Sequence, residues 1–154
     1  MEEKRLEKLN GFFVTAFNEI LAWEDQSLRK IGRTDISVRE MHIIEAVSML
    51  EEDNLNTMAN IAKVLSVSPG SLTTGVNALV KKGYLTRRHD EKDRRRVLVT
   101  PTESGIEVNN AHKKFHDEMV KFISGILSDS EMDTLLKALE KLTEFFMKQA
   151  AVKR

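Results

Sequence analysis

The cations of this sequence are concentrated in one short stretch. Residues 81–96 contain eight basic and three acidic side chains, a net charge of +5, although the formal net charge of the 154-residue chain is zero. The rest of the chain therefore carries a net charge of −5. One basic element on a mildly acidic body is typical of a protein that contacts nucleic-acid phosphates.

Within this stretch, Asp93 is followed by three arginines, Arg94, Arg95 and Arg96. Arginine side chains suit a narrow DNA minor groove, where the negative potential is enhanced. We expect Asp93 to orient one of these arginines through a bidentate pair. A solvated charged surface is the alternative interpretation of this run.

A second group of residues interrupts the apolar patterns. Glu24 and His112 occupy helical positions where apolar side chains are expected, and His116 follows His112 by one turn. Two histidines at this spacing can bind one metal ion, and His42 with Glu24 would complete a tetrahedral shell suited to zinc. The same residues can instead form a buried hydrogen-bonded cluster or lie at the edge of a ligand pocket. The sequence leaves these alternatives open.

These side chains must be positioned by a mainly helical chain, because apolar residues recur mostly at helical spacing and only two prolines are present. After a first long helix, the capping box of Ser37 with Glu40 opens the next one. Thr102 is expected to cap a second long helix, and Ser128 with Glu131 to open the last.

Two short helices in the middle of the chain are separated by a tight turn. Thr57 is expected to cap the first, and Ser68 caps the second, which stops at Gly83. Two helices joined in this way form a helix-turn-helix. The periodicity then changes to that of two short strands, 84–88 and 96–100, joined by a polar loop. This pattern predicts a β-wing.

In a helix-turn-helix, the second helix enters the major groove, so its outer face must reach base edges and phosphates. Hydroxyls can bond phosphates, threonine methyls can contact thymine, and an asparagine can pair with adenine. The small Gly70 and Gly75 permit close backbone approach. Solvated positions on an exposed helix are the alternative. The candidate DNA-binding residues are Ser68, Gly70, Ser71, Thr73, Thr74, Asn77 and Lys81 on the helix and Arg88, Lys92, Asp93, Arg94, Arg95 and Arg96 on the wing.

The long helices at the two ends of the chain carry more apolar surface than a small winged domain can cover. Isologous pairing with a second copy would bury it and produce a homodimer with two wings. A monomeric helical domain is the alternative. A two-fold dimer predicts that the double-stranded DNA partner is a pseudo-palindromic operator with half-sites about 10 base pairs apart.

Several functional classes are disfavoured. Cysteine is absent, which excludes disulfides and thiolate chemistry. No apolar run is long enough for a membrane span and no signal peptide is recognisable, so we expect a cytoplasmic protein without a membrane partner. We expect no enzymatic activity, because a metal shell of four protein ligands leaves no open position for a substrate. A winged helix used as a protein-interaction module is a further alternative, but it has no need for the arginine cluster.

The sequence resembles the MarR (multiple-antibiotic-resistance regulator) family of winged-helix repressors over essentially its whole length. The resemblance is carried by the helix-turn-helix, the phrase LVKKGYL at 79–85, Asp93-Arg94-Arg95, and TESG at 102–105. Pro101 stands where the family usually has leucine, which removes an amide donor from the strand end.

This resemblance implies a mainly α fold with a small β-wing, a winged helix-turn-helix with long N- and C-terminal dimerisation helices. A single MarR-type domain would span 1–154, with the DNA-binding lobe at 37–102 and the dimerisation helices at 1–31 and 103–150.

Four segments are similar to the fatty-acid-biosynthesis repressors of Gram-positive bacteria: 35–37, 40–42, 72–74 and 112–116. That similarity implies a repressor whose operator binding is strengthened by long-chain acyl groups delivered on acyl carrier protein. The aromatic residues of the first helix and the seven methionines could line an acyl tunnel, or they are simply core. The four residues Glu24, His42, His112 and His116 also look like the metal site of zinc-responsive members of the family, which makes zinc the alternative effector.

Overall fold

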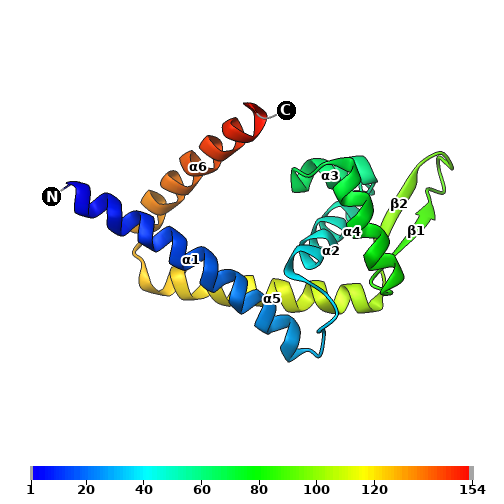
Figure 1. The fold of residues 1–154 in the computed structure, drawn as a ribbon, viewed down its shortest axis with the longest axis horizontal. Helices are drawn as coiled ribbons and strands as arrows, with labels where there is room; N and C mark the ends of the chain where they lie inside the picture. Colours follow the sequence, from blue (N-terminus) through cyan, green and yellow to red (C-terminus); the bar gives the residue numbers. More distant parts are fainter. Residues whose placement is uncertain (1, 153–154) are drawn as a thin grey trace. The chain divides into compact units, whose positions relative to one another are not determined.

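The computed structural model describes residues 2–152 and is mainly helical with one two-stranded antiparallel sheet, as the sequence predicted. The chain divides into two compact units, Met1–Phe115 and His116–Arg154. The elements in chain order are α1 (Glu2–Lys30), α2 (Val38–Glu51), α3 (Met58–Leu65), α4 (Pro69–Lys81), β1 (Leu85–His89), β2 (Val97–Pro101), α5 (Glu103–Ile126) and α6 (Asp129–Val152), as labelled in Figure 1.

The helix starts follow their caps. The backbone amide of Ser37 donates to Glu40 Oε2 at 2.9 Å, and the Ser37 hydroxyl accepts from the Glu40 amide at 3.3 Å, which completes the predicted capping box. The hydroxyls of Thr57 and Ser68 cap α3 and α4 by accepting from the amides of Asn60 and Ser71, and Pro69 occupies the first turn of α4. These predicted helix starts are confirmed.

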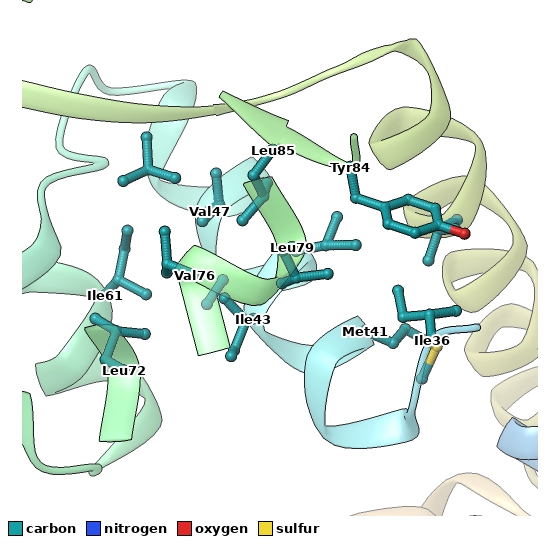
Figure 2. Close-up of a cluster of buried hydrophobic side chains, with 14 of the residues drawn as sticks. Ile36, Met41, Ile43, Val47, Ile61, Leu72, Val76, Leu79, Tyr84 and Leu85 are labelled. Atoms are coloured by element: carbon teal, nitrogen blue, oxygen red, sulfur yellow. The ribbon is translucent and has the colours of Figure 1, made fainter. Parts of the chain in front are cut away.

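The core of the first unit lies where α2, α3 and α4 pack together and against the base of the sheet (Figure 2). Residues of α4 that point inward at helical spacing, Leu72, Val76 and Leu79, are at most 1% exposed. Met41 and Val47 of α2 belong to the same core cluster and are fully buried. Because this stripe fixes the rotation of α4 about its own axis, the opposite side of the helix must face outward.

The wing is a hairpin in which β1 pairs with β2 from Leu85 opposite Pro101 to His89 opposite Val97. Each strand lies one residue later than the sequence predicted. Tyr84 is not the first strand residue, because its amide still donates to the Leu79 carbonyl at the end of α4, at 2.9 Å. Pro101 at the strand end is tolerated, since the following amide, that of Thr102, bonds the Tyr84 carbonyl at 3.0 Å.

A third segment joins the wing, which the sequence did not predict. Thr57 forms an isolated antiparallel bridge with Leu98. The buried Asn56 side chain donates to the Val99 carbonyl at 2.8 Å, and the Val99 amide donates to the Asn56 carbonyl at 2.9 Å. The polar connection between α2 and α3 therefore anchors the base of the wing.

The long helices expose apolar side chains within each unit. On α1 of the first unit, those between 50 and 61% exposed are Leu6, Leu9, Phe12, Val14, Phe17 and Leu21. On α6 of the second unit, those between 45 and 69% exposed are Leu136, Leu139, Phe145, Phe146 and Met147. Even so, no helix in the described range 2–152 is long and apolar enough to cross a membrane.

Candidate nucleic-acid interface and histidine cluster

The outer face of α4 presents the residues that the sequence singled out there. All seven are exposed: Ser68, Gly70, Ser71, Thr73, Thr74, Asn77 and Lys81. The hydroxyls of Thr73 and Thr74 donate to the carbonyls of Pro69 and Gly70, at 2.8 and 3.1 Å. Their protons are used inside the helix, so their methyl groups and hydroxyl oxygens are what they can offer to a partner.

The two glycines of α4 have different surroundings. A Cβ built at Gly75 would lie 2.5 Å from Ile43 Cδ1, so the missing side chain lets α4 pack against α2. This corrects the expectation that Gly75 permits close approach of DNA. At Gly70 no atom lies within 4 Å of an added Cβ, so that position is open.

Asn77 connects α4 to the wing. Its Oδ1 accepts a hydrogen bond from Arg87 Nη2 of β1 at 2.7 Å. This oxygen is the atom that would accept from the adenine amino group in the predicted base pairing. Because an amide oxygen has two lone pairs, Asn77 can keep the bond to Arg87 and still accept from a base.

The wing loop positions its arginines differently from the prediction. Asp93 Oδ1 accepts from the backbone amide of Arg95 at 3.0 Å, and the Asp93 carbonyl accepts from the Arg96 amide at 2.9 Å. The prediction of a bidentate pair between Asp93 and an arginine is therefore wrong: a short side chain placed two residues before an amide closes a turn instead. Arg88, Lys92, Arg94 and Arg95 are exposed, as DNA contacts would require.

Arg96 is the wing arginine that is partly buried. Its Nη1 lies 2.8 Å from Asp90 Oδ2, and its Nη2 donates to the Asn54 carbonyl at 3.0 Å. Asp90 is only 3% exposed. The bond from the Lys92 amide, and to a lesser extent the charge of Arg96, hold the pKa of Asp90 below its ordinary value, although burial acts in the opposite direction.

Arg39 is a further cation beside α4 that sequence reasoning missed. It is exposed in the first turn of α2 and lines a hollow of about 320 Å³ together with Ser71 and Thr74. Lys82, at the end of α4, bonds Glu40 Oε1 at 2.8 Å and so ties the two helices together. No sequence pattern could place Arg39 here, because only the packing of α2 on α4 does so.

The structure brings together three of the four residues proposed as a metal site or buried cluster. Glu24 of α1 and His112 of α5 are 2% and 1% exposed. Glu24 Oε1 lies 3.3 Å from His42 Nε2 and 3.9 Å from His112 Nδ1. One donor atom from each of the three lies within 4.8 Å of the others. His116, four residues further along α5, belongs to the second unit.

Glu45 is a fourth member of the cluster that the sequence did not reveal. Its Oε2 lies 3.3 Å from His112 Nε2, so the buried imidazole has a carboxylate near each ring nitrogen. The available signal was its spacing: Glu45 follows His42 by three residues on α2 and therefore shares a face with it.

A cavity of about 280 Å³ adjoins this cluster, and His42 and Glu45 contribute to its lining. Its apolar wall comes from Met49, Val64 and Leu65, and Lys113 lies at its polar side. The arrangement agrees with the expectation of a pocket edge as well as with that of a hydrogen-bonded cluster.

Comparisons with known proteins agree with this architecture. Residues 36–97 match the model of the MarR family. The chain is 27% identical over 110 residues to the HTH-type transcriptional regulator SarZ of Staphylococcus haemolyticus, covering 71% of each protein. It is 32% identical over 101 residues to the uncharacterized HTH-type transcriptional regulator YcgE of Bacillus subtilis, covering 66% of this chain and 58% of that protein.

Solved structures extend the likeness to nearly the whole chain. Streptococcus pneumoniae FabT in complex with DNA is 33% identical, with a TM-score of 0.81, and the match covers 94% of this chain and 99% of that one. The MepR–DNA complex of S. aureus is 25% identical, with a TM-score of 0.72 and coverage of 88% and 94%. Together with the exposed α4 and the basic wing, these matches show that the chain belongs to the MarR family of DNA-binding transcription regulators.

Proposed function

We propose that this protein is a homodimeric repressor in which α4 and the wing of each protomer bind one half of a pseudo-palindromic operator. The observation that carries the proposal is the outer face of α4, whose seven predicted contact residues are all exposed and uncharged or basic, in the same lobe as the exposed Arg94 and Arg95. In this proposal the DNA-binding lobe spans 37–102. The α4 residues read base edges in the major groove, and the wing arginines enter the minor groove.

The dimer is proposed from the exposed apolar side chains of the long helices. Apolar residues that stay half exposed along α1, and others along α6, are more than a soluble surface normally carries in one place. Segments 1–31 and 103–150 would bury these side chains against the same segments of a second copy. A two-fold pair of this kind spaces two recognition helices for half-sites about one helical turn apart.

Selection of binding sites from a random duplex library tests this proposal. The recovered DNA is expected to contain an inverted repeat whose half-sites are centred about 10 base pairs apart. A protein with Arg94 and Arg95 both replaced by alanine should recover no motif at the same salt concentration, whereas Lys137→Ala, an exposed cation on α6, should recover it unchanged. Recovery of unrelated sequences by the parent protein would contradict specific recognition.

Repression of fatty-acid-biosynthesis genes, with an acyl group on acyl carrier protein as co-repressor, is the regulatory role we propose. Its support is the similarity to FabT over 94% of the chain, together with the family segments around His42 and His112. The cavity beside the cluster, with its apolar wall of Met49, Val64 and Leu65, is a candidate site for part of the acyl chain.

Zinc is the alternative effector, and the Glu24, His42 and His112 geometry is the observation that favours it. Ligand atoms in a tetrahedral zinc site lie about 3.3 Å apart, since each zinc–nitrogen bond is about 2.0 Å. The separations of 3.3 and 3.9 Å from Glu24 Oε1 to the two imidazoles are close to this value. Glu45 on the far ring nitrogen of His112 is the carboxylate partner that metal-bound histidines commonly have.

The two effectors are separated by adding each one to an operator-binding assay. The acyl role predicts tighter binding with acylated carrier protein and no response to zinc. The zinc role predicts the reverse. It also predicts that the parent protein binds metal stoichiometrically and that replacing the half-buried His42 with alanine abolishes this binding. Native mass spectrometry of the protein purified without chelators reports retained lipid or metal. If no zinc is bound under zinc-replete conditions, the zinc alternative is refuted.

A further inference from the structure

A side-chain contact joins the wing of this protein to the body of the lobe at the point where the two strands pass into the wing loop. The Arg96 guanidinium bonds Asp90 Oδ2 at 2.8 Å and the carbonyl of Asn54 at 3.0 Å. Asn54 lies in the connection between α2 and α3, where its backbone adopts a left-handed conformation with φ of 56°. Arg96 therefore joins the wing loop to a segment 42 residues earlier in the chain.

Both carboxylate oxygens of Asp90 accept hydrogen bonds. Oδ1 accepts from the Lys92 amide at 2.9 Å while Oδ2 accepts from Arg96, and the Asp90 amide itself donates to the Arg96 carbonyl at 3.0 Å. These bonds close the base of the loop that carries Arg94 and Arg95. A carboxylate here is otherwise unfavourable for DNA binding, because it adds negative charge beside cations that would contact phosphates.

We infer that Asp90, Arg96 and Asn54 form a wing clamp: Asp90 and Arg96 are positioning residues that hold Arg94 and Arg95 in the direction needed for the minor groove. This inference rests on the proposed DNA contacts of Arg94 and Arg95. It assigns Arg96 a different task from theirs, since its guanidinium is engaged within the protein. A loop fixed before binding loses less conformational entropy when it meets DNA than a loop that must be ordered.

Two alternatives make opposite predictions for the same substitution. If Asp90 acts only through its charge, its removal strengthens DNA binding, because one repulsive interaction with phosphate disappears. If Asp90 acts through the clamp, its removal weakens binding, because the loop is released. Glu91 is the matched control, since it is the next residue, carries the same charge and is exposed.

The first experiment measures operator affinity of full-length Asp90→Ala and Glu91→Ala at several salt concentrations. The clamp predicts that Asp90→Ala weakens binding about tenfold while Glu91→Ala leaves it unchanged or slightly tighter. Faster amide hydrogen exchange at residues 91–95 of the free Asp90→Ala protein is expected alongside. Operator binding by Asp90→Ala that is as tight as the parent's overturns the clamp.

A double-mutant cycle distinguishes a clamp from a direct phosphate contact by Arg96. The clamp predicts that Arg96→Gln weakens binding to the same degree as Asp90→Ala and that the double variant is no weaker than either. A direct contact predicts additive losses and a salt slope reduced by about one for each wing engaged in the case of Arg96→Gln. Additivity therefore overturns the inference, and Arg96→Gln supplies a second route if Asp90→Ala fails to fold.

Arg94→Ala separates failure of the clamp from failure of the proposed function. If Arg94→Ala weakens binding and Asp90→Ala does not, only the clamp is refuted. If Arg94→Ala has no effect, the proposed wing contact is refuted as well. If the wing contact and the clamp are both correct, adding Asp90→Ala to the double variant that lacks Arg94 and Arg95 weakens binding little further, because neither arginine remains for the clamp to position.

Discussion

Asn77 Oδ1 on α4 lies 2.7 Å from Arg87 Nη2 on β1, so the helix proposed to read the major groove is bonded directly to the first strand of the wing. The two elements proposed to contact DNA are thereby linked before DNA arrives. The same bond uses one of the two lone pairs of the oxygen that sequence reasoning assigned to an adenine.

Asn77→Ala removes both this bond and the amide that we propose faces DNA. We expect operator affinity to fall roughly fivefold, corresponding to the net worth of one hydrogen bond of about 1 kcal/mol. Asn110→Ala, at an exposed position of α5, is the matched control and should bind as the parent does. Fluorescence anisotropy with labelled operator measures both, and equal affinities for the two variants would remove Asn77 from the interface.

Gly105→Ala is expected to destabilise the protein. A Cβ at Gly105 would collide with the backbone carbonyl oxygen of Tyr84 and lie 3.2 Å from Pro101 Cβ. Since backbone cannot move aside as a flexible side chain can, the free energy of unfolding should fall by about 2 kcal/mol. Gly70→Ala, also within a helix but with open space around it, should change it by at most about 0.5 kcal/mol. Urea denaturation measures the stability of both variants. Similar denaturation midpoints for Gly105→Ala and Gly70→Ala would contradict the close approach of Gly105 to the Tyr84 carbonyl.

Tyr84→Phe is expected to shift the titration of Asp35. The Tyr84 hydroxyl donates to Asp35 Oδ1 at 2.7 Å, and this bond holds the pKa of Asp35 below its ordinary value. A lowered folded-state pKa means that Asp35 stabilises the fold above the unfolded value of about 4, and that this contribution is lost as the pH falls through the lowered value.

Removing the hydroxyl should therefore return the pKa of Asp35 toward its ordinary value. At neutral pH the free energy of unfolding should fall by about 1 kcal/mol, and the difference between Tyr84→Phe and the parent should vanish in strong acid. NMR titration of the Asp35 carboxyl is the direct readout. An Asp35 pKa that does not change on substitution refutes the assigned cause.

Phe146→Glu is expected to break the proposed dimer. Phe146 is 53% exposed on α6, and a dimer that buries it would lose about 3 kcal/mol on charge substitution, roughly a 100-fold rise in the dimer dissociation constant. Lys137→Gln makes the chain more negative by the same one unit on the opposite side of the same helix, since nine residues separate it from Phe146, and should leave the dimer intact. Sedimentation equilibrium reports the masses, and a parent protein that is monomeric at micromolar concentration would refute the dimer itself.

Features of the fold that depend on local chemistry could be predicted from the sequence. The caps at Ser37, Thr57 and Ser68 define helix starts through bonds that reach only three residues, and all three are confirmed. The change of periodicity after Gly83 predicted the wing to within one residue at each strand. The family, confirmed by the comparisons, further identifies a DNA-binding regulator and not an enzyme.

What the sequence could not predict are contacts between segments that share no periodicity. Asn56 bonds Val99, and Arg96 bonds the carbonyl of Asn54, across more than forty residues. The run of three arginines in the sequence likewise gave no sign that Arg96 alone turns inward. The sequence also could not show that Gly75 lies against Ile43, because Ile43 comes from another helix and only the packing of α2 on α4 reveals that contact.

The salt dependence of operator binding tests the central claim most directly. For the parent protein we expect operator to bind far more tightly than a shuffled duplex, with an affinity that falls steeply between 50 and 200 mM salt, on the order of a hundredfold or more. With Arg94 and Arg95 both replaced by alanine, the slope of log affinity against log salt should decrease by about two for each wing engaged. An unchanged slope in that variant, or equal parent affinities for operator and shuffled DNA, would contradict recognition by α4 and the wing.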